Sequence, residues 1–343
     1  MAAKPSERAE AWALFDWIVA DAAPEGVHSN PWRRDPVSGE RRYVPDFDTL
    51  KRLLGVPLHM DSRSQSGIRA LALDVWLSYE LRRAGFDPDS TWPRAEHPRI
   101  LPKSVANLLA ALPAAERKVV ADRIEGRSSI RGVTSSSASI LGKNYVKQVD
   151  VIMTDWLSGP ELLISTKRMD SSYGKNAPNR IEESYGDAKN LRLRHPLAAL
   201  GFLLCLRSDI LEKEPDTAEW LIDLMGKLGR EDDAYHATCL LMIEYSDALV
   251  PDDDGEPADE SVLGAGGVEI SDSDERPEPS SIGAGLESTL RSLPRVLIRE
   301  DAIPSHLAPS RFLAEMVERV LDTTPVTFHK NARARRRTAP VGE

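Results

Sequence analysis

Between residues 103 and 245 the chain alternates between helical stretches and short apolar runs, and this order constrains its fold most. In the helical stretches apolar residues recur every three to four positions, whereas the apolar runs have the length and composition of strands. The predicted order is a helix at 103–124, strands at 144–154 and 161–168, a helix at 179–194, a strand at 199–207, a helix at 216–228 and a strand at 238–245. This order is typical of an α/β domain with a mixed sheet flanked by helices.

Composition changes along the chain predict four parts. Helical periodicity at 5–22, 47–54 and 66–84 indicates an α-helical N-terminal part, and the Pro- and Arg-rich residues 30–46 are expected to form a loop. We predict a helical N-terminal domain at 1–100, an α/β core at 101–250, an acidic flexible linker at 251–285 and a helical segment with a basic tail at 286–343. The N-terminal domain is expected either to recognise DNA or a partner or to serve as a plain scaffold.

Charge is distributed unevenly. The chain has 44 Lys and Arg against 54 Asp and Glu, for a formal net charge of −10. Residues 252–278 hold eleven acids and one base, so this segment accounts for the whole excess (11 − 1 = 10) and the rest is formally neutral. The acidic balance therefore does not argue against a nucleic-acid partner. The five bases of 330–337 predict either a solvated tail or an arm that contacts phosphates.

Several classes of protein find no support in the sequence. No apolar run approaches the roughly 20 residues that span a bilayer, and the polar residues 1–8 do not resemble a signal peptide. The two cysteines, Cys205 and Cys239, lie in apolar runs and are expected to be buried thiols, so we expect a cytoplasmic protein without membrane contact. Metalloprotease, Walker A, dinucleotide-binding and GxSxG motifs are absent.

One constellation points to chemistry. Asp150 lies in an apolar strand, and Lys167 lies seventeen residues later near the end of the next strand, with which it is predicted to form a hairpin. Burying either charge alone is costly, so the two indicate a cross-strand ion pair or a site for a metal and a phosphate. Ser165 shares a strand face with Lys167, whereas Lys147, three residues before Asp150, is expected on the opposite face.

A magnesium-dependent phosphodiesterase needs about two carboxylates to hold Mg²⁺ and a polar group to act on the attacking water. Asp150 supplies one carboxylate. Glu182 and Glu183 follow Lys167 by fifteen and sixteen residues on the predicted helix, and either can supply the second. If Glu182 is used in a capping box with Asn179, Glu183 is the better ligand.

The pattern Asp150, Ser165-Thr166-Lys167 and Glu182 or Glu183 resembles that of the PD-(D/E)xK nuclease superfamily, the fold of many restriction endonucleases. It is most similar to the variant in which the motif reads SxK and the glutamate has moved to the next helix. The resemblance covers roughly residues 103–248. Ser165 stands where the family more often has a carboxylate, and Val149 stands where it often has proline.

This resemblance implies a restriction endonuclease-like fold and Mg²⁺-dependent cleavage of DNA to 5′-phosphate and 3′-hydroxyl ends. By position, Asp150 and Glu183 would ligate the metal, with Glu182 as the alternative ligand, and Lys167 would orient or activate water. Ser165 completes the predicted catalytic set.

The residues after Lys167 are polar and basic, as expected of a loop and helix that contact nucleic acid. The alternative is an ordinary solvated loop and helix face. The residues predicted to contact DNA are Arg168, Lys175, Asn176, Asn179, Arg180 and Lys189.

These observations predict a Mg²⁺-dependent DNA endonuclease, of the restriction or another defence type. Because one site cuts one strand, we expect a homodimer, with a cognate methyltransferase or other defence subunit as a candidate partner. The alternative is a non-catalytic DNA-binding or assembly subunit that keeps a degenerate nuclease fold.

Overall fold

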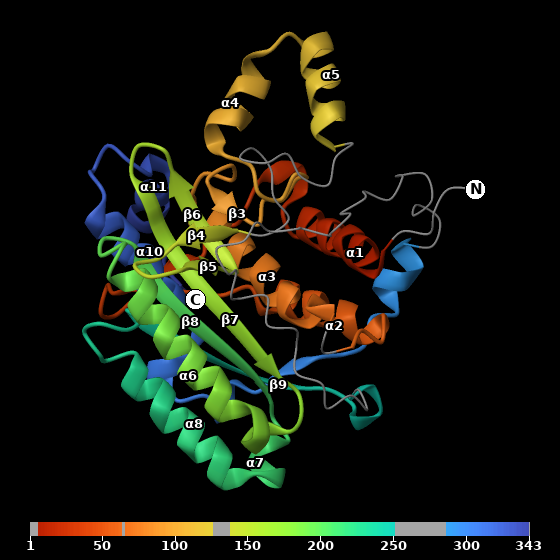
Figure 1. Ribbon diagram of the computed structural model, residues 1–343, viewed down its shortest axis with the longest axis vertical. Coiled ribbons are helices and arrows are strands. Elements are labelled where there is room, and N and C mark those ends of the chain that lie inside the picture. The colour runs from red at the N-terminus through yellow and green to blue at the C-terminus, as the bar shows by residue number, and fades with distance from the viewer. Residues whose placement is uncertain (1–5, 64–65, 126–137, 251–285, 343) are drawn as a thin grey trace.

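The computed structural model describes residues 6–63, 66–125, 138–250 and 286–342, and it contains a six-stranded mixed sheet (Figure 1). The three central strands β7, β8 and β9 run parallel, and the outer pairings are antiparallel. In spatial order the strands are β10 (Leu297–Ile298), β9 (Ala237–Glu244), β8 (Ala199–Arg207), β7 (Gly159–Met169), β6 (Val151–Asp155) and β3 (Thr91–Trp92). The predicted α/β class with a mixed sheet is confirmed.

Helices cover both faces of the sheet. Helices α6 (Tyr173–Arg192) and α8 (Pro215–Leu228) lie side by side on one face (Figure 1). Helices α3 (Ile68–Ala84) and α10 (Pro309–Thr323) pack on the other. Successive residues of β7 alternate between these two cores, and every residue of β8 is buried. An uninterrupted apolar run such as β8 is expected of a parallel strand covered on both faces.

The N-terminal hundred residues join this core. Helices α1 (Glu7–Ala22) and α2 (Phe47–His59) pack on α3, and their apolar side chains share one cluster with those of α10 and the sheet. Strand β3 also adds to the sheet edge beside β6. The boundary predicted at residue 100 therefore does not separate two hydrophobic cores.

Three predicted elements differ in the structure. The helix predicted at 103–124 is two helices, α4 (Lys103–Ala111) and α5 (Ala114–Glu125), with Pro113 between them. The strand predicted at 144–154 is interrupted, and the loop predicted at 30–46 contains a short hairpin. The hairpin consists of β1 (Trp32–Arg34) and β2 (Arg41–Tyr43). The interrupted strand consists of β5 (Val146–Gln148) and β6, and β5 pairs with β4 (Ser139–Leu141).

Residues 286–291 form a further helical segment, and short helical turns lie elsewhere in the described part. They are η1 (Pro24–Gly26), α7 (Ile210–Lys213), η3 (Asp247–Leu249), η4 (Glu300–Ala302) and η5 (Ser305–Leu307). No helix in the described ranges combines the length and apolar character needed to cross a membrane. Cys205 and Cys239 are buried and unbridged, as predicted. The acidic linker predicted at 251–285 lies outside the described residues.

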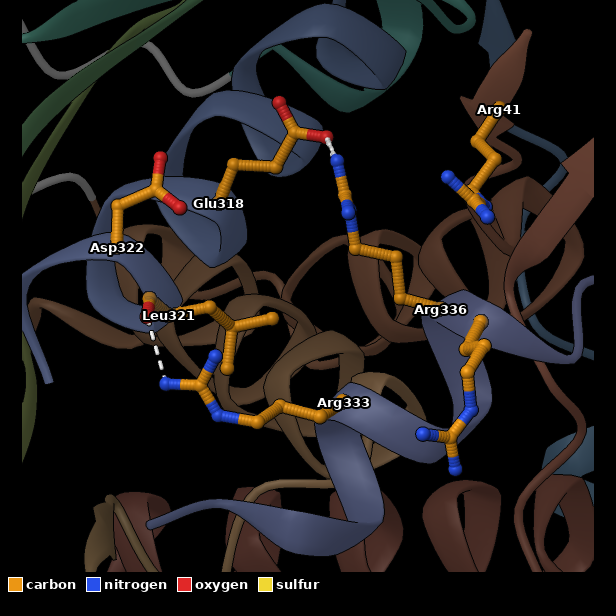
Figure 2. Close-up of a pocket in the computed structure, with 7 residues that line it drawn as sticks. Arg41, Glu318, Leu321, Asp322, Arg333 and Arg336 are labelled. Atoms are coloured by element: carbon orange, nitrogen blue, oxygen red, sulfur yellow. Dashed lines mark hydrogen bonds and ion pairs between the residues drawn. The ribbon is translucent and has the colours of Figure 1, made fainter. Parts of the chain in front are cut away.

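The basic C-terminal residues form a packed helix, α11 (Lys330–Arg337). Arg333 donates to the backbone carbonyls of Leu321 and Thr324 at 2.6 and 2.9 Å, and Arg336 pairs with Glu318 (Figure 2). These arginines fasten α11 to α10, so the stretch is not a solvated tail, and the contact of an arm with phosphates stays a prediction.

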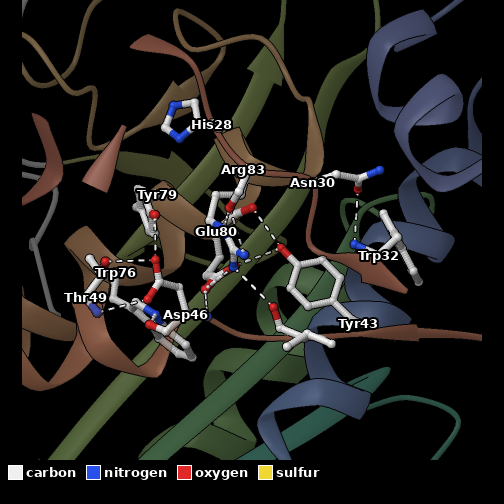
Figure 3. A network of polar contacts seen from close by, with 12 residues as sticks. His28, Asn30, Trp32, Tyr43, Asp46, Thr49, Trp76, Tyr79, Glu80 and Arg83 are labelled. Carbon is white, nitrogen blue, oxygen red and sulfur yellow. Dashed lines mark hydrogen bonds and ion pairs between the residues drawn. The ribbon is translucent and has the colours of Figure 1, made fainter. Parts of the chain in front are cut away.

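A buried polar network joins the hairpin β1–β2 to α2 and α3 (Figure 3). Glu80 of α3, with no exposed surface, pairs with Arg83 at 2.7 Å. It also accepts hydrogen bonds from the Tyr43 hydroxyl at 3.0 Å and the Asp46 backbone amide at 2.6 Å. Because each partner comes from a different element, this carboxylate determines how the three elements meet.

Candidate functional site

The candidate site lies where β6 separates from β7. Pairing between the two strands ends at Val151 and Ile164, because the chain before Val151 turns away as β5 and pairs with β4. The Thr166 backbone amide, two residues beyond the last pair, donates instead to the Asp150 carboxylate at 2.7 Å. Asp150 thus occupies the opening between the diverging strands, and the prediction that it lies within a strand is wrong, because β5 ends at Gln148 and β6 begins at Val151.

A second carboxylate, buried and not among the predicted site residues, reaches Thr166 from the other layer. The Thr166 hydroxyl donates to Asp74 of α3 at 2.6 Å, so Thr166 links Asp150 and Asp74. Burial and the negative charge of Asp150 raise the pKa of Asp74 well above its usual value. Burial also raises the pKa of Asp150, although the charge of Lys167 opposes this. An acid within the apolar helical run 68–77 was the sequence signal for Asp74.

Lys167 extends from β7 toward α6 and pairs with Glu183 at 2.8 Å. Ser165 lies on the same strand face and is buried. Glu183 also contacts Lys147 at 3.1 Å and Arg180 at 3.4 Å. Burial opposes its ionisation, but the charges of Lys167 and Lys147 prevail and lower the pKa of Glu183 to about 2. Of the two candidate glutamates, the structure places Glu183 beside Lys167 and leaves Glu182 exposed.

Lys147 lies on the site side of the sheet, contrary to the predicted opposite face. Its ammonium contacts Asp187 at 2.6 Å as well as Glu183. The parity of a regular strand does not apply between Lys147 and Asp150, because β5 ends at Gln148 and β6 begins only at Val151. Asp187 also accepts a hydrogen bond from the Tyr145 hydroxyl at 3.2 Å. Lys147 and Asp187 are therefore further site residues that strand parity did not find.

Helix α6 begins at Tyr173, so the predicted capping box of Asn179 and Glu182 is wrong. The buried Tyr173 hydroxyl donates to the Asp209 carboxylate at 2.5 Å and the Asp170 carbonyl at 3.0 Å. These contacts fix the start of α6 six residues before the predicted start at Asn179. Pro178, in the sixth helical position, does not end the helix.

The predicted DNA-contacting residues divide by exposure. Arg168 is buried on the α3 side and pairs with Asp170 at 3.0 Å, so it is not available to a nucleic acid. Arg180 pairs with Glu183 in the site, and Lys189 pairs with Asp233 at 3.1 Å. Lys175 and Asn179 are exposed on α6, and Asn176 is half-buried.

The chemistry of this donor set is compatible with a single hard cation. In the described part of the chain no three His, Cys, Asp or Glu side chains gather as a metal-binding group. Magnesium in proteins, however, is commonly held by one or two carboxylates, with water and substrate phosphates as the other ligands. Asp74 and Asp150 repel each other, and a cation between them would relieve this repulsion.

Comparisons with family models, curated proteins and solved structures found no match to this chain. Function is therefore inferred from the geometry of the site.

The ion pairs of Glu183 carry a testable stability contribution. We expect Glu183→Gln to lower the free energy of unfolding by about 2 kcal/mol at pH 7, because Lys147 and Lys167 lose their shared counter-charge. The lowered folded-state pKa means that this contribution is present above the unfolded pKa, near 4.3, and is lost as the pH falls toward 2.

Urea unfolding of the parent and Glu183→Gln at pH 7 and pH 3 measures this difference. The matched control is Glu182→Gln, which removes an exposed charge one residue away and should leave stability unchanged. Equal stability of Glu183→Gln and the parent at pH 7 would contradict the assignment.

Proposed function

We propose that this protein is a magnesium-dependent endonuclease that hydrolyses DNA to 5′-phosphate and 3′-hydroxyl ends. The observation that carries the proposal is the pair of carboxylates, buried Asp74 and half-buried Asp150, which Thr166 joins next to Lys167 in the chain. Two like charges held together are costly, and the cost is relieved either by a proton, which the raised pKa of Asp74 favours, or by a bound cation, which we propose for the working state.

In this proposal Asp150 and Asp74 hold Mg²⁺. When bound, the ion would supply a lowered pKa for coordinated water and stabilisation of charge on a phosphate. Glu183 is already neutralised by its cationic neighbours, so we assign it the positioning of Lys167 in place of the metal ligation implied by the resemblance. Lys167 would orient a water or the scissile phosphate.

The arrangement of elements supports a restriction endonuclease-like fold. Strands β6 and β7 form an antiparallel pair, α6 follows, and β8 returns parallel to β7, in agreement with the order on which the resemblance rests. Asp74 supplies the carboxylate that Ser165 lacks. We further propose that Lys175, Asn176 and Asn179 contact DNA beside the site, and that two copies act together because each site cuts one strand.

A second candidate function is a non-catalytic DNA-binding subunit. The observation that favours it is that no group of three metal-ligating side chains occurs in the described residues. The two candidates differ in whether a folded protein cuts DNA.

Incubation with supercoiled plasmid in Mg²⁺ or in EDTA tests the proposal. We expect the parent to nick or linearise the plasmid only with Mg²⁺, and Lys167→Ala to cut at least 100-fold more slowly. The control is Lys118→Ala, which removes an exposed cation on α5. Absence of cutting by the folded parent on unmodified and modified DNA would favour the non-catalytic subunit. Full activity of Lys167→Ala would contradict the site.

A further inference from the structure

The hairpin β1–β2 places four arginines directly opposite one another. In the strand register Arg33 faces Arg42 and Arg34 faces Arg41. Like charges on directly opposed strand positions destabilise a hairpin. The strands are nevertheless kept together, because Trp32 and Tyr43 pack edge to face at 5.2 Å in the core. Arg33 already donates to the carbonyls of Asn30 and Trp32, and Arg34 donates to that of Arg337, whereas Arg41 is exposed.

The C-terminal residues pair with this hairpin through their backbone. The Arg34 amide donates to the Pro340 carbonyl, and the Gly342 amide donates to the Arg34 carbonyl, both at 2.8 Å. Residues more than 300 positions apart in the sequence therefore form one continuous surface.

A cavity of about 280 Å³ opens between the hairpin, α10 and α11 (Figure 2). Its charged lining comprises four arginines and two acids, which leaves a formal excess of two positive charges (4 − 2). The lining residues are Arg41, Arg333, Arg336, Arg337, Leu321, Glu318 and Asp322.

The arginines of this cavity differ in what they already bind. Arg333 donates to backbone carbonyls, and Arg336 pairs with Glu318. Arg41 and Arg337 are exposed, and within the described ranges neither has an ion-pair partner. Two guanidinium groups therefore remain for a ligand, and the guanidinium fork matches the geometry of phosphate oxygens.

We propose that Arg41 and Arg337 bind backbone phosphates of a nucleic acid, so that hairpin β1–β2 and α11 form a docking surface outside the cleavage site. The choice of DNA as the ligand rests on the proposed function. A phosphodiester backbone suits this surface because it supplies successive negative charges, so that neighbouring phosphates can meet Arg41 and Arg337 at the cavity.

Fluorescence anisotropy with a labelled 20-base-pair duplex tests the proposal, in EDTA so that no DNA is cut. For the double variant Arg41→Ala/Arg337→Ala we expect about tenfold weaker binding. We also expect the slope of log affinity against log salt to fall by about 2, roughly one for each lost phosphate contact. The control is the double variant Lys118→Ala/Arg291→Ala, which also removes two exposed positive charges but away from the cavity. It should bind like the parent.

Unchanged affinity and salt slope in the arginine double variant would overturn the proposal, as would an equal loss in the control. The proposal would also be overturned if the arginine double variant bound inorganic pyrophosphate more weakly but bound the duplex like the parent. The cavity would then serve a small phosphate ligand. Matching circular dichroism spectra and melting temperatures verify that the variants are folded. Failure of the proposed cleavage activity can be told apart from failure of this docking surface. Asp150→Asn should lose cutting and still bind the duplex.

Discussion

Asp150→Asn is expected to reduce Mg²⁺-dependent plasmid cleavage by at least about 1000-fold while raising the melting temperature of the metal-free protein. The activity falls because an amide is a poor ligand for a hard cation, and loss of metal-assisted charge stabilisation costs several kcal/mol. The stability rises because the raised pKa values of Asp150 and Asp74 show that their ionised forms are costly when buried. The remaining amide oxygen can still accept from the Thr166 amide.

A thermal melt with and without Mg²⁺, beside the plasmid assay, measures both effects. Mg²⁺ should raise the melting temperature of the parent and leave that of Asp150→Asn unchanged, since only a bound ion stabilises the folded state. Asp74→Asn should behave in the same way. Asn107→Asp, which adds an exposed carboxylate on α4, is a control that should retain the Mg²⁺ response. An Asp150→Asn protein that is less stable than the metal-free parent, or equally active, would refute the role of this pair.

Arg83→Met is expected to lower the free energy of unfolding by about 3–5 kcal/mol at pH 7, because it leaves the fully buried Glu80 carboxylate without its cation. Burial already raises the pKa of Glu80 despite Arg83. A carboxyl group with a raised folded-state pKa stabilises the fold when protonated and loses this contribution as the pH rises through that pKa. The deficit of Arg83→Met should therefore be largest at pH 7 and shrink toward pH 4.

Urea unfolding at pH 7 and pH 4.5 measures the deficit. The control Arg52→Met breaks the partly exposed pair with Asp21, at 2.6 Å, and should cost less than about 1 kcal/mol. A deficit for Arg83→Met that is below 1 kcal/mol, or that does not change with pH, would show that Glu80 does not depend on this partner.

The elements of the α/β core were predictable because their signals are local. Strand β8 coincides with the predicted 199–207, since an uninterrupted apolar run has few alternatives to a strand buried on both faces. The common face of Ser165 and Lys167 followed from the period of two in β7. Helix α8 begins and ends within one residue of its prediction.

Two other predictions from local sequence patterns were wrong, each for a physical reason. Asn179 and Glu182 have the residue types and spacing of a capping box. The helix nevertheless begins at Tyr173, because the contacts of Tyr173 with Asp170 and Asp209 extend α6 in the N-terminal direction. The face of Lys147 was mispredicted, because pairing with β4 bends the chain between β5 and β6. In both cases a tertiary contact outweighed a local preference.

The sequence by itself determined the mixed α/β class and placed Asp150, Lys167 and Glu183 on adjoining elements. Only the tertiary structure brought Asp74 to Thr166 across 92 positions of sequence and fastened Arg333 to α10 and Arg335 to α3. The physical reason is that periodicity reports which face of an element is buried, whereas the partner on that face depends on how layers pack. In a sequence, a charged residue at such a contact looks like one on the solvated surface. The structure shows whether that charge is paired with an opposite charge, close to a like charge or available to a ligand.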